Sequence, residues 1–288
     1  MIDFPKRHRV PYDGRFSAAN LSAEPPKGTP SKDALEEELE DLVDRLDKLQ
    51  QRLFADGRFA LLTVFQALDA AGKDSTIRKV FSGVNPAGFR VHAFGRPSEL
   101  ELRHDFLQRV AARLPERGKI GVFNRSHYEE VLVVRVVPQF LDAQHLPDVN
   151  LKRVWKDRFE SIRTFEEHLA KNGTVIVKFW LNVSRKEQKK RFIARIREAD
   201  KNWKFRLGDL DDRARWDDFQ QAYEDALRAT SRPFAPWYAI PADSKAYMRV
   251  AVARTIVEAL ARLDPKYPKL GAAQRRELNE GLSRLERE

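Results

Sequence analysis

The chain has 288 residues, of which 42% are hydrophobic, so it is long enough to bury a full core as one large domain or as a domain with a lid. It contains no cysteine, which excludes disulfides and thiolate metal sites, and its apolar runs are far too short to cross a bilayer. It has 53 basic and 43 acidic residues, a formal net charge of +10, and no secretory signal opens the sequence, so we expect a soluble cytoplasmic protein.

Residues 1–30 contain five prolines and no periodic pattern, which predicts an irregular N-terminal arm. A helix is then predicted from Ser31 to Gly57, because six leucines recur at alternating spacings of four and three residues. These leucines are Leu35, Leu39, Leu42, Leu46, Leu49 and Leu53. A leucine seam of this kind either forms a dimer or packs within the chain, and we favour packing within the chain.

A candidate phosphate-binding loop follows this helix. Residues 59–65 form an apolar run that is typical of a strand buried on both faces of a parallel sheet. A loop of small residues runs from Ala67 to Gly72, Lys73 follows it, and a helical pattern begins near Ser75. Backbone N–H groups and the helix dipole together favour an anion at such a position. We therefore expect phosphate oxygens to lie against this loop.

The loop departs from the strict phosphate-loop (Walker A) pattern at two places. Ala67 stands where the first glycine is expected, and Asp74 follows the lysine, so that Ser75 comes one position late. The plain alternative is an ordinary tight turn between a strand and a helix. Asp69 favours the functional interpretation, because a carboxylate in an anion-binding loop is best explained by a divalent cation between it and the phosphates.

The rest of the chain alternates between strands and helices. Four more strands are predicted at residues 89–94, 120–123, 174–181 and 237–240. Helices are predicted at residues 98–113, 150–170, from 184 onward and at 245–263. Capping boxes, Ser98-x-x-Glu101 and Ser184-x-x-Glu187, open two of these helices. The alternation predicts an α/β fold with a five-stranded parallel sheet between two layers of helices, and ligands bind at the carboxyl ends of such strands.

A second polar signal follows the strand at 120–123. Asn124 and Arg125 come directly after this strand, and Glu129 and Glu130 lie in the next turn. If the sheet is parallel, these residues share an edge with the glycine-lysine loop. There an arginine can hold phosphate oxygens with two hydrogen bonds, and carboxylates can hold Mg²⁺ directly or through water. A polar turn that only caps a helix is the alternative.

The third signal is a basic segment. Residues 185–216 contain twelve Lys and Arg against six Asp and Glu, a net charge of +6, which indicates a polyanionic partner; a solvated helix face is the plain alternative. Its sequence KNWKFRLGD occupies the position of the mobile lid in nucleotide-kinase-like folds, so we predict a lid at about 190–215. Tyr128, Trp203 and Phe205 are either aromatic partners for a nucleotide base or packing residues.

Three stretches of the chain resemble the polyphosphate kinase 2 family, most closely its class III branch. They are LDAAGKDSTIRKVFSGVNPAGFRVHAF, LPERGKIGVFNRSHYEEVLVVRV, and the segment that begins KNWKFRLGD. The resemblance covers roughly residues 30–265. It implies a phosphate-loop kinase-like three-layer sandwich over residues 31–265, with a helical lid and a C-terminal tail at 266–288. It also implies Mg²⁺-dependent, reversible phosphoryl transfer from inorganic polyphosphate to AMP and ADP, with Mn²⁺ as a second candidate metal.

The resemblance assigns expected roles to individual residues. Asp69 matches the metal-binding aspartate of the loop, and the Glu129–Glu130 pair matches the branch that accepts AMP. The expected catalytic residues are Asp69, Lys73, Asn124, Arg125, Glu129 and Glu130. The expected phosphate-binding residues are Ala70, Ala71, Gly72, Lys73, Asp74, Ser75, Arg78, Arg125, Lys204 and Arg206. Ala67 departs from the glycine that most members carry, which leaves the geometry of the loop open.

Two other functions compete with this one. An ATP-dependent nucleotide kinase of the thymidylate-kinase type would use the same loop, but the basic segment favours a polymeric donor. A basic nucleic-acid-binding module would explain the charge, although the sequence shows no DNA- or RNA-binding motif. We therefore expect polyphosphate and AMP or ADP as partners, with GMP and GDP as further acceptors, no nucleic acid or membrane partner, and a homodimer or homotetramer.

Overall fold

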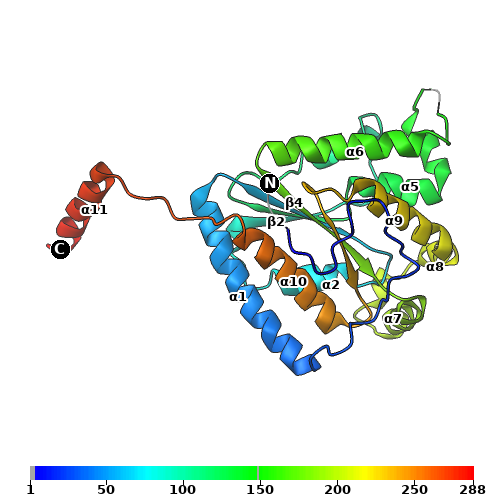
Figure 1. The fold of residues 1–288 in the computed structure, drawn as a ribbon, viewed down its shortest axis with the longest axis horizontal. Helices are drawn as coiled ribbons and strands as arrows, with labels where there is room; N and C mark the ends of the chain where they lie inside the picture. Colours follow the sequence, from blue (N-terminus) through cyan, green and yellow to red (C-terminus); the bar gives the residue numbers. More distant parts are fainter. Residues whose placement is uncertain (1–3, 148) are drawn as a thin grey trace.

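The computed structural model describes residues 4–147 and 149–288. Its centre is a five-stranded sheet with the strand order β2-β3-β1-β4-β5, in which all neighbouring strands are parallel (Figure 1). The strands are β1 Ala60–Gln66, β2 Phe89–Ala93, β3 Ile120–Asn124, β4 Thr174–Asn182 and β5 Trp237–Pro241. All five lie within one or two residues of the predicted bounds, and the predicted α/β fold with a parallel sheet is confirmed.

Helices cover both faces of the sheet. One layer contains α1 Lys32–Asp56, α2 Lys73–Val80 and α10 Lys245–Ala261. The other layer contains α5 Val133–Val136, α6 Val154–Lys171 and α9 Trp216–Thr230. The two groups lie on opposite sides of the strands (Figure 1). No helix in the described ranges is long and apolar enough to span a membrane.

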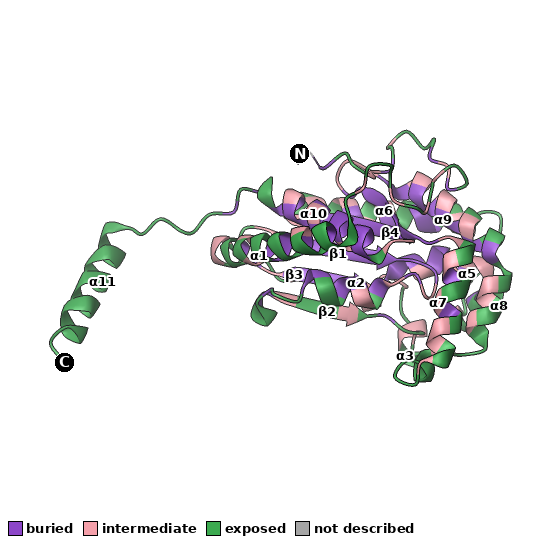
Figure 2. Ribbon diagram, turned by 90° about the horizontal axis from the view of Figure 1, so that it is seen from below, coloured by how far each residue is buried: buried purple, intermediate pink, exposed green. Residues whose placement is uncertain are grey.

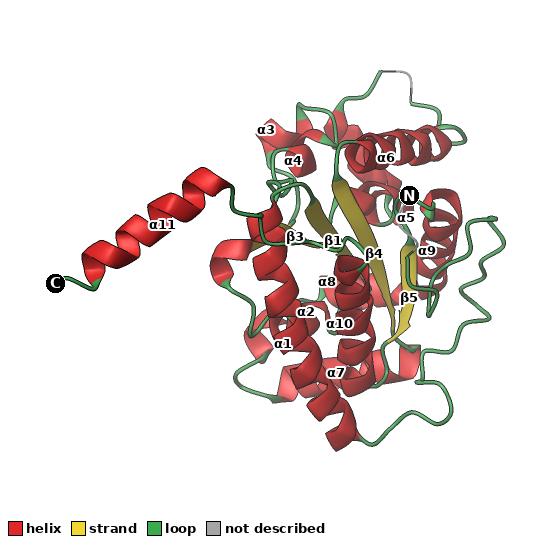
Figure 3. Ribbon diagram, turned by 60° about the vertical axis from the view of Figure 1, so that its left-hand side comes forward, coloured by secondary structure: helices red, strands yellow, loops and turns green. Residues whose placement is uncertain are grey.

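The leucine seam packs within the chain, as predicted. Helix α1 lies against α10, and the two run side by side over the sheet (Figure 3). Five of the six leucines are buried and Leu49 is half-buried. The helix begins after Ser31, whose hydroxyl accepts the N–H of Ala34, and ends at Gly57, which has a φ of 65°. This face of α1 is therefore covered by its own chain.

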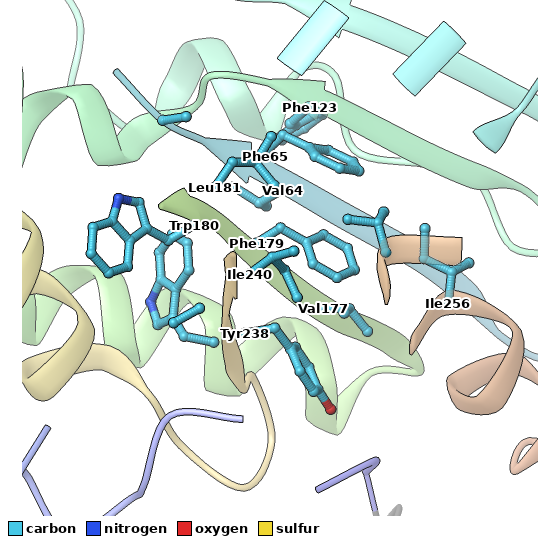
Figure 4. Close-up of a cluster of buried hydrophobic side chains, with 14 of the residues drawn as sticks. Val64, Phe65, Phe123, Val177, Phe179, Trp180, Leu181, Tyr238, Ile240 and Ile256 are labelled. Carbon is cyan, nitrogen blue, oxygen red and sulfur yellow. The ribbon is translucent and has the colours of Figure 1, made fainter. Parts of the chain in front are cut away.

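The core behind the carboxyl edge of the sheet is aromatic. Figure 4 shows side chains of β1, β3, β4, β5 and α10 interdigitating, and Figure 2 shows that the strands at the centre are buried. Phe65 stacks on Phe179 with ring centroids 5.0 Å apart, and Phe94 meets Phe123 edge to face at 4.9 Å. These rigid contacts fix the ends of β1 and β3, from which the polar residues of the site extend.

The structure corrects one predicted helix and one predicted capping box. The helix expected at 98–113 is divided into α3 Glu99–Leu102 and α4 Gln108–Ala111. The Ser98–Glu101 capping box forms, but the carboxylate of Asp105 accepts the N–H of Leu107 and so favours a turn between the helices. At Ser184 only half of the predicted box forms. Its hydroxyl accepts the N–H of Glu187, but its own N–H donates to Asp243.

The two ends of the chain behave differently. The N-terminal segment, which is largely irregular, runs along the outer edge of β5, where the Val10 N–H donates to the Trp237 carbonyl at 2.8 Å. Phe4, Val10 and Phe16 are buried there, so this edge of the sheet is covered. The segment expected as a C-terminal tail contains helix α11 Ala272–Leu285, which projects from the body and is exposed along its length (Figures 2 and 3).

The predicted lid segment lies between β4 and β5 along the chain. It contains α7 Arg185–Arg197 and α8 Gly208–Ala214. Short 3-10 turns complete the structure at Pro86–Gly88, His127–Val131, Pro138–Gln144 and Asn202–Lys204. Helices α7 and α8 lie at the end of the molecule opposite to α11 (Figure 1).

Candidate active site

The loop after β1 has a backbone that is suited to an anion. Two of its residues have positive φ, 61° at Ala70 and 107° at Gly72. Left-handed residues placed among right-handed ones turn backbone N–H groups toward a common side and so form an anion-binding concavity. At Gly72 a side chain would be strained by this φ, and a Cβ atom would lie 3.1 Å from Met248. The loop therefore needs glycine at this position.

Ala67 does not disturb the loop. It is not among the described residues with positive φ, so its backbone has no need of a glycine. Its carbonyl accepts a 2.7 Å hydrogen bond from the Nζ atom of Lys73, whose side chain is buried. Burial lowers the pKa of Lys73, the charge of Arg125 lowers it further, and the charge of Asp69 opposes both. The Lys73 ammonium thus lies within the loop, beside the peptide groups that would face a phosphate.

Arg125 joins the two polar segments that were predicted to share an edge. Phe65 and Asn124 are register partners, so the turn after β3 lies beside the loop after β1. The guanidinium of Arg125 donates to Asp69 Oδ1 at 3.0 Å and lies 3.7 Å from Glu129 Oε2. Arg125 itself has a positive φ of 64°. We refer to Asp69, Lys73, Arg125 and Glu129 as the phosphate-loop cluster.

The two carboxylates of this cluster have pKa shifts of opposite sign. Burial would raise the pKa of Asp69, but the charges of Lys73 and Arg125 outweigh it and hold this pKa below its ordinary value. Burial raises the pKa of Glu129, and in this case Arg125 and Lys73 do not compensate fully. With its amide nitrogen turned toward Glu129, Gln66 donates to Oε1 at 2.8 Å. The Glu129 carboxylate is therefore placed beside Arg125, although burial destabilises its charged form.

Two further carboxylates, Asp209 and Asp212, line the same small cavity as Asp69, Arg125 and Glu129. Burial and the charge of Asp69 raise the pKa of both aspartates, although Arg195 lies 3.3 Å from Asp209. Negative charge accumulates on this side of the cavity. A cation placed among these carboxylates would relieve their mutual repulsion.

The remaining predicted phosphate-binding residues surround the start of α2. Asn124 donates to Asp74 at 2.8 Å, and Lys204 approaches Asp74 to 3.8 Å from the lid segment. The hydroxyl of Ser75 donates to the Gly72 carbonyl at 3.0 Å. Arg78 on α2 is another of these predicted residues, and its side chain is exposed. The backbone N–H of Arg206 lies 3.5 Å from the carboxylate of Asp209, on the cavity side of the lid segment.

The structure does not bring Glu130 to the cluster. Its buried carboxylate accepts hydrogen bonds from Arg158 and Gln144, both at 2.8 Å. These contacts lie beside a separate cavity of about 490 Å³, at the start of α6. The turn His127–Val131 directs Glu129 and Glu130 to different sides, and an adjacent pair in a sequence cannot reveal this.

The three aromatic candidates for base stacking also separate. Tyr128 is fully buried and is therefore a packing residue. Phe205 lies edge to face against Phe192 at 6.4 Å. Trp203 is 74% exposed and is the one of the three that a ligand could reach freely.

A buried polar network lies behind the turn after β3. It consists of Tyr128, Glu166 of α6 and Lys178 of β4. The Lys178 ammonium donates to Tyr128 Oη at 2.7 Å, to Glu166 and to the Thr230 carbonyl at 2.9 Å, while Tyr128 donates to Glu166 at 2.8 Å. Burial lowers the pKa of Lys178 to about 8. Burial would raise the pKa of Glu166, but Lys178 and His127 together outweigh it and lower this pKa.

Sequence reasoning did not single out several residues that contact the phosphate loop, the cluster or the cavity beside it. Gln66 ends β1, while Gln188, Arg191 and Arg195 extend from α7. One signal was available for Arg191, because Glu187 precedes it by four residues in a helix, and the two form an ion pair at 2.9 Å. The direction in which this pair faces depends on how α7 packs, which is a tertiary property.

The donor set of the cavity is compatible with magnesium. No group of three or more His, Cys, Asp or Glu close enough to enclose a metal occurs in residues 4–147 and 149–288. Mg²⁺ does not require such a cage, since it commonly takes one or two carboxylates and completes its shell with phosphate oxygens and water. Asp69, with Asp209 and Asp212 across the cavity, offers a set of that kind.

The chain is similar to known proteins in both sequence and fold. The family model for polyphosphate kinase 2 matches residues 29–268. The chain is 50% identical over 278 residues to an ADP-polyphosphate phosphotransferase of Rhodopseudomonas palustris, with 95% of each protein covered. It is 46% identical to an AMP/ADP-polyphosphate phosphotransferase of Meiothermus ruber, covering 92% of this chain and 96% of that protein. A crystal structure of polyphosphate kinase 2 from Arthrobacter aurescens superposes with a TM-score of 0.85 at 38% identity, covering 97% of this chain and 99% of that one.

Proposed function

The chain belongs to the polyphosphate kinase 2 family, and we propose from this premise that the phosphate-loop cluster transfers a phosphoryl group from inorganic polyphosphate to AMP and ADP. As a member, the chain is a polyphosphate-dependent nucleotide phosphotransferase. The observation that carries the site assignment is the convergence of Asp69, Lys73 and Arg125 at the carboxyl ends of β1 and β3.

The proposed roles follow from the needs of phosphoryl transfer. In the step, the terminal P–O–P bond of polyphosphate breaks, a phosphate oxygen of the nucleotide bonds to that phosphorus, and the shortened polymer leaves with the electron pair. A loose transition state requires mainly positioning and charge neutralisation. Lys73 and the amides of the loop bind the transferred phosphate, and Arg125 holds its oxygens. Glu129 orients Arg125. Asn124 orients Asp74 at the start of α2.

No strong general base is required for this reaction. The second pKa of a phosphate monoester is about 6, so the attacking oxygen of AMP is already largely ionised at neutral pH. The carboxylates of the cavity are thus free to position cations. Asp69 would hold Mg²⁺, or Mn²⁺ in its place, with Asp209 and Asp212 nearby. A metal ion bound there supplies positive charge to the phosphate oxygens.

The lid segment binds the polymer in this proposal. Its net charge of +6 over residues 185–216 provides a track for a chain of phosphates, and Lys204 already lies 3.8 Å from Asp74 at the edge of the loop. Arg206 extends the track. Closure of the segment would exclude water, which otherwise competes with the nucleotide as acceptor. Phe205 and Trp203 are carried on the same segment.

Self-association belongs to the proposal as well. The seam of α1 is covered within the chain, so it is not the dimer interface. The exposed leucines of α11, which are Leu278, Leu282 and Leu285, offer a surface for a second copy. We expect a homodimer or homotetramer, and light scattering coupled to size-exclusion chromatography measures it directly.

The experiment that tests the function is a donor and acceptor matrix. Purified protein is incubated with Mg²⁺, one donor and one acceptor. The donor is long polyphosphate or ATP, and the acceptor is AMP, ADP, GMP or GDP. The nucleotides are then separated by chromatography. We expect ADP and ATP from AMP, and loss of product when a chelator removes the metal. Turnover with ATP as the sole donor and none with polyphosphate would support the thymidylate-kinase alternative. Folded protein that forms no nucleotide product with any donor would refute the proposal.

A further inference from the structure

One arginine of α7 contacts two loops of the active-site edge at once. The Nη1 atom of Arg191 donates to the Ala71 carbonyl at 2.7 Å and to the Ala70 carbonyl at 3.4 Å. Its Nη2 atom donates to the carbonyls of residues 242 and 243, at 2.7 and 3.0 Å, in the loop after β5. Only 8% of the side chain is exposed, and its Nε atom donates to Glu187 at 2.9 Å. Every nitrogen of this guanidinium is therefore engaged with the protein.

A second residue on the same face of α7 continues the pattern. The amide of Gln188 donates to the Asp69 carbonyl at 2.9 Å, and its oxygen accepts from Arg213 of α8 at 2.7 Å. Three successive carbonyls of the phosphate loop, those of residues 69, 70 and 71, are thus bonded to α7. The loop and the lid segment are connected through this helix.

The direction of these carbonyls fixes the direction of the loop amides. In a trans peptide the C=O of one residue and the N–H of the next point to opposite sides. Carbonyls 69 and 71 face α7, so the N–H groups of Ala70 and Gly72 point away from it. The N–H of Ala71 is used within the loop, where it donates to the Leu68 carbonyl at 3.2 Å. The two amides that remain are those of the residues with positive φ, 61° and 107°.

We infer that Arg191, supported by Gln188, is a positioning residue that holds the phosphate loop in its anion-binding conformation. Left-handed backbone at a residue other than glycine persists only where its surroundings impose it, and Ala70 is such a residue. The planar guanidinium supplies donors in fixed directions to both loops, which a lysine ammonium on a flexible stem cannot do. The inference rests on the proposed function, because it assigns to Arg191 the support of the loop that binds phosphate.

The test compares Arg191→Met and Arg191→Lys with a matched control, Arg163→Met. Arg163 also donates to a backbone carbonyl, that of Ala229 at 3.1 Å, but on α6 and away from the loop. We expect Arg191→Met to lower kcat by about 100-fold, the scale of a reacting group displaced by about an ångström, with a smaller change in the nucleotide KM. Arg191→Lys should recover part of the loss. The control should keep the kcat of the parent.

Binding of inorganic tripolyphosphate provides a readout that does not depend on turnover. Calorimetry should show weaker binding to Arg191→Met than to the parent and the control, and tripolyphosphate should raise its Tm less. The Tm without ligand should differ little between the two methionine variants. A parental kcat and a parental tripolyphosphate Kd in Arg191→Met would overturn the inference. A loss of kcat that is fully explained by the fraction of unfolded Arg191→Met protein would also overturn the inference. If the parent binds tripolyphosphate but transfers nothing, the proposed function fails, and the binding comparison still decides the role of Arg191.

Discussion

Two buried glutamates on neighbouring elements have pKa shifts of opposite sign. Glu166 in the buried polar network has a pKa below its ordinary value, because Lys178 and His127 together overcome the effect of burial. Glu129 in the phosphate-loop cluster has a raised pKa, because burial exceeds the compensation from Arg125 and Lys73. In the network, all three donors of the Lys178 ammonium have acceptors. The cluster instead opens onto a cavity lined by further carboxylates.

Under the proposed function, the difference separates a structural network from a ligand-binding cluster. A lysine whose three donors are all used within the protein has no capacity left for a ligand, and its removal is felt as lost stability. A cluster with incompletely balanced charge gains from a phosphate or a metal ion that completes it, at the expense of the ligand-free fold. Substitutions in the two regions should therefore affect different measurements.

The largest effect is expected on turnover, in the cluster. Asp69→Ala and Lys73→Ala should each reduce kcat by at least about 1,000-fold, or about 4 kcal/mol, since Lys73 neutralises the transferred phosphate and Asp69 would hold the metal ion in the proposed mechanism. Their Tm should stay within a few degrees of the parent, because both residues lie at the carboxyl edge of the sheet and not in its apolar core. Steady-state kinetics and calorimetry measure the two quantities. Near-normal activity in either variant would mean that the loop has been assigned wrongly.

The next effect is expected on stability, in the network. Lys178→Met leaves the Glu166 carboxylate buried without its partner, and it should lower the free energy of unfolding by about 3 kcal/mol. The double variant Glu166→Leu/Lys178→Met should recover part of this loss, because it removes both charges. Chemical denaturation gives both values. If Lys178→Met kept its stability and lost its turnover instead, the boundary between the two regions would be drawn in the wrong place.

Acid should weaken the same pair without creating a cavity. The pKa of Glu166 is lower in the folded state than its ordinary value of 4.5, so its contribution to stability is present above about pH 4.5. That contribution is lost as the pH falls through the folded pKa. The free energy of unfolding, measured from pH 7 downward, should fall more steeply for the parent than for Glu166→Gln. Parallel curves would show that other carboxylates govern acid unfolding.

A smaller effect is expected in the lid segment. Reversing the charge with Lys204→Glu and Arg206→Glu should raise the KM for long polyphosphate by about tenfold and change the nucleotide KM less, because only the polymer follows the basic track. The difference should shrink as salt is added. Equal changes for both substrates would place these two residues at the nucleotide instead.

The smallest expected effect is a gain in stability when Glu129 in the cluster loses its charge. Glu129→Gln removes a carboxylate whose burial is incompletely compensated, so it should raise the free energy of unfolding by about 1 kcal/mol while it lowers kcat. Denaturation and kinetics on the same preparation test this trade-off. A Glu129→Gln protein that was both less stable and fully active would contradict the contrast between the two glutamates.

Patterns that lie within a few residues of one another were predictable from the sequence. The apolar run of β1 and the glycine-lysine turn identified the loop, and parallel pairing then brought Arg125 to Asp69. The contrast between Glu129 and Glu130 was not predictable, because the turn that separates them depends on contacts with Arg158 and Gln144 from elsewhere in the chain. The break after α3 was missed although the Asp105 side chain that favours it is local, because the capping box and the apolar spacing around it indicated one continuous helix.

The hydrogen bonds from Arg191 and Gln188 to the phosphate loop could not be predicted from the sequence, for a similar reason. Arg191 and Gln188 belong to a basic helix in the sequence, and their carbonyl partners come from two segments that are far apart along the chain. Every residue has a backbone carbonyl, so a sequence does not show which carbonyls accept hydrogen bonds from side chains. Their acceptor role becomes visible only when the sheet brings the loops after β1 and β5 beside α7.

The projecting helix α11 has a practical consequence. It lies at the opposite end of the molecule from α7 and α8, and residues 262–271 connect it to the body without a strand or helix of their own (Figure 1). An affinity tag or a covalent tether attached there would leave the carboxyl edge of the sheet facing solvent. An immobilised enzyme built in this orientation could be washed free of spent polymer and supplied again, with its catalytic face directed away from the support.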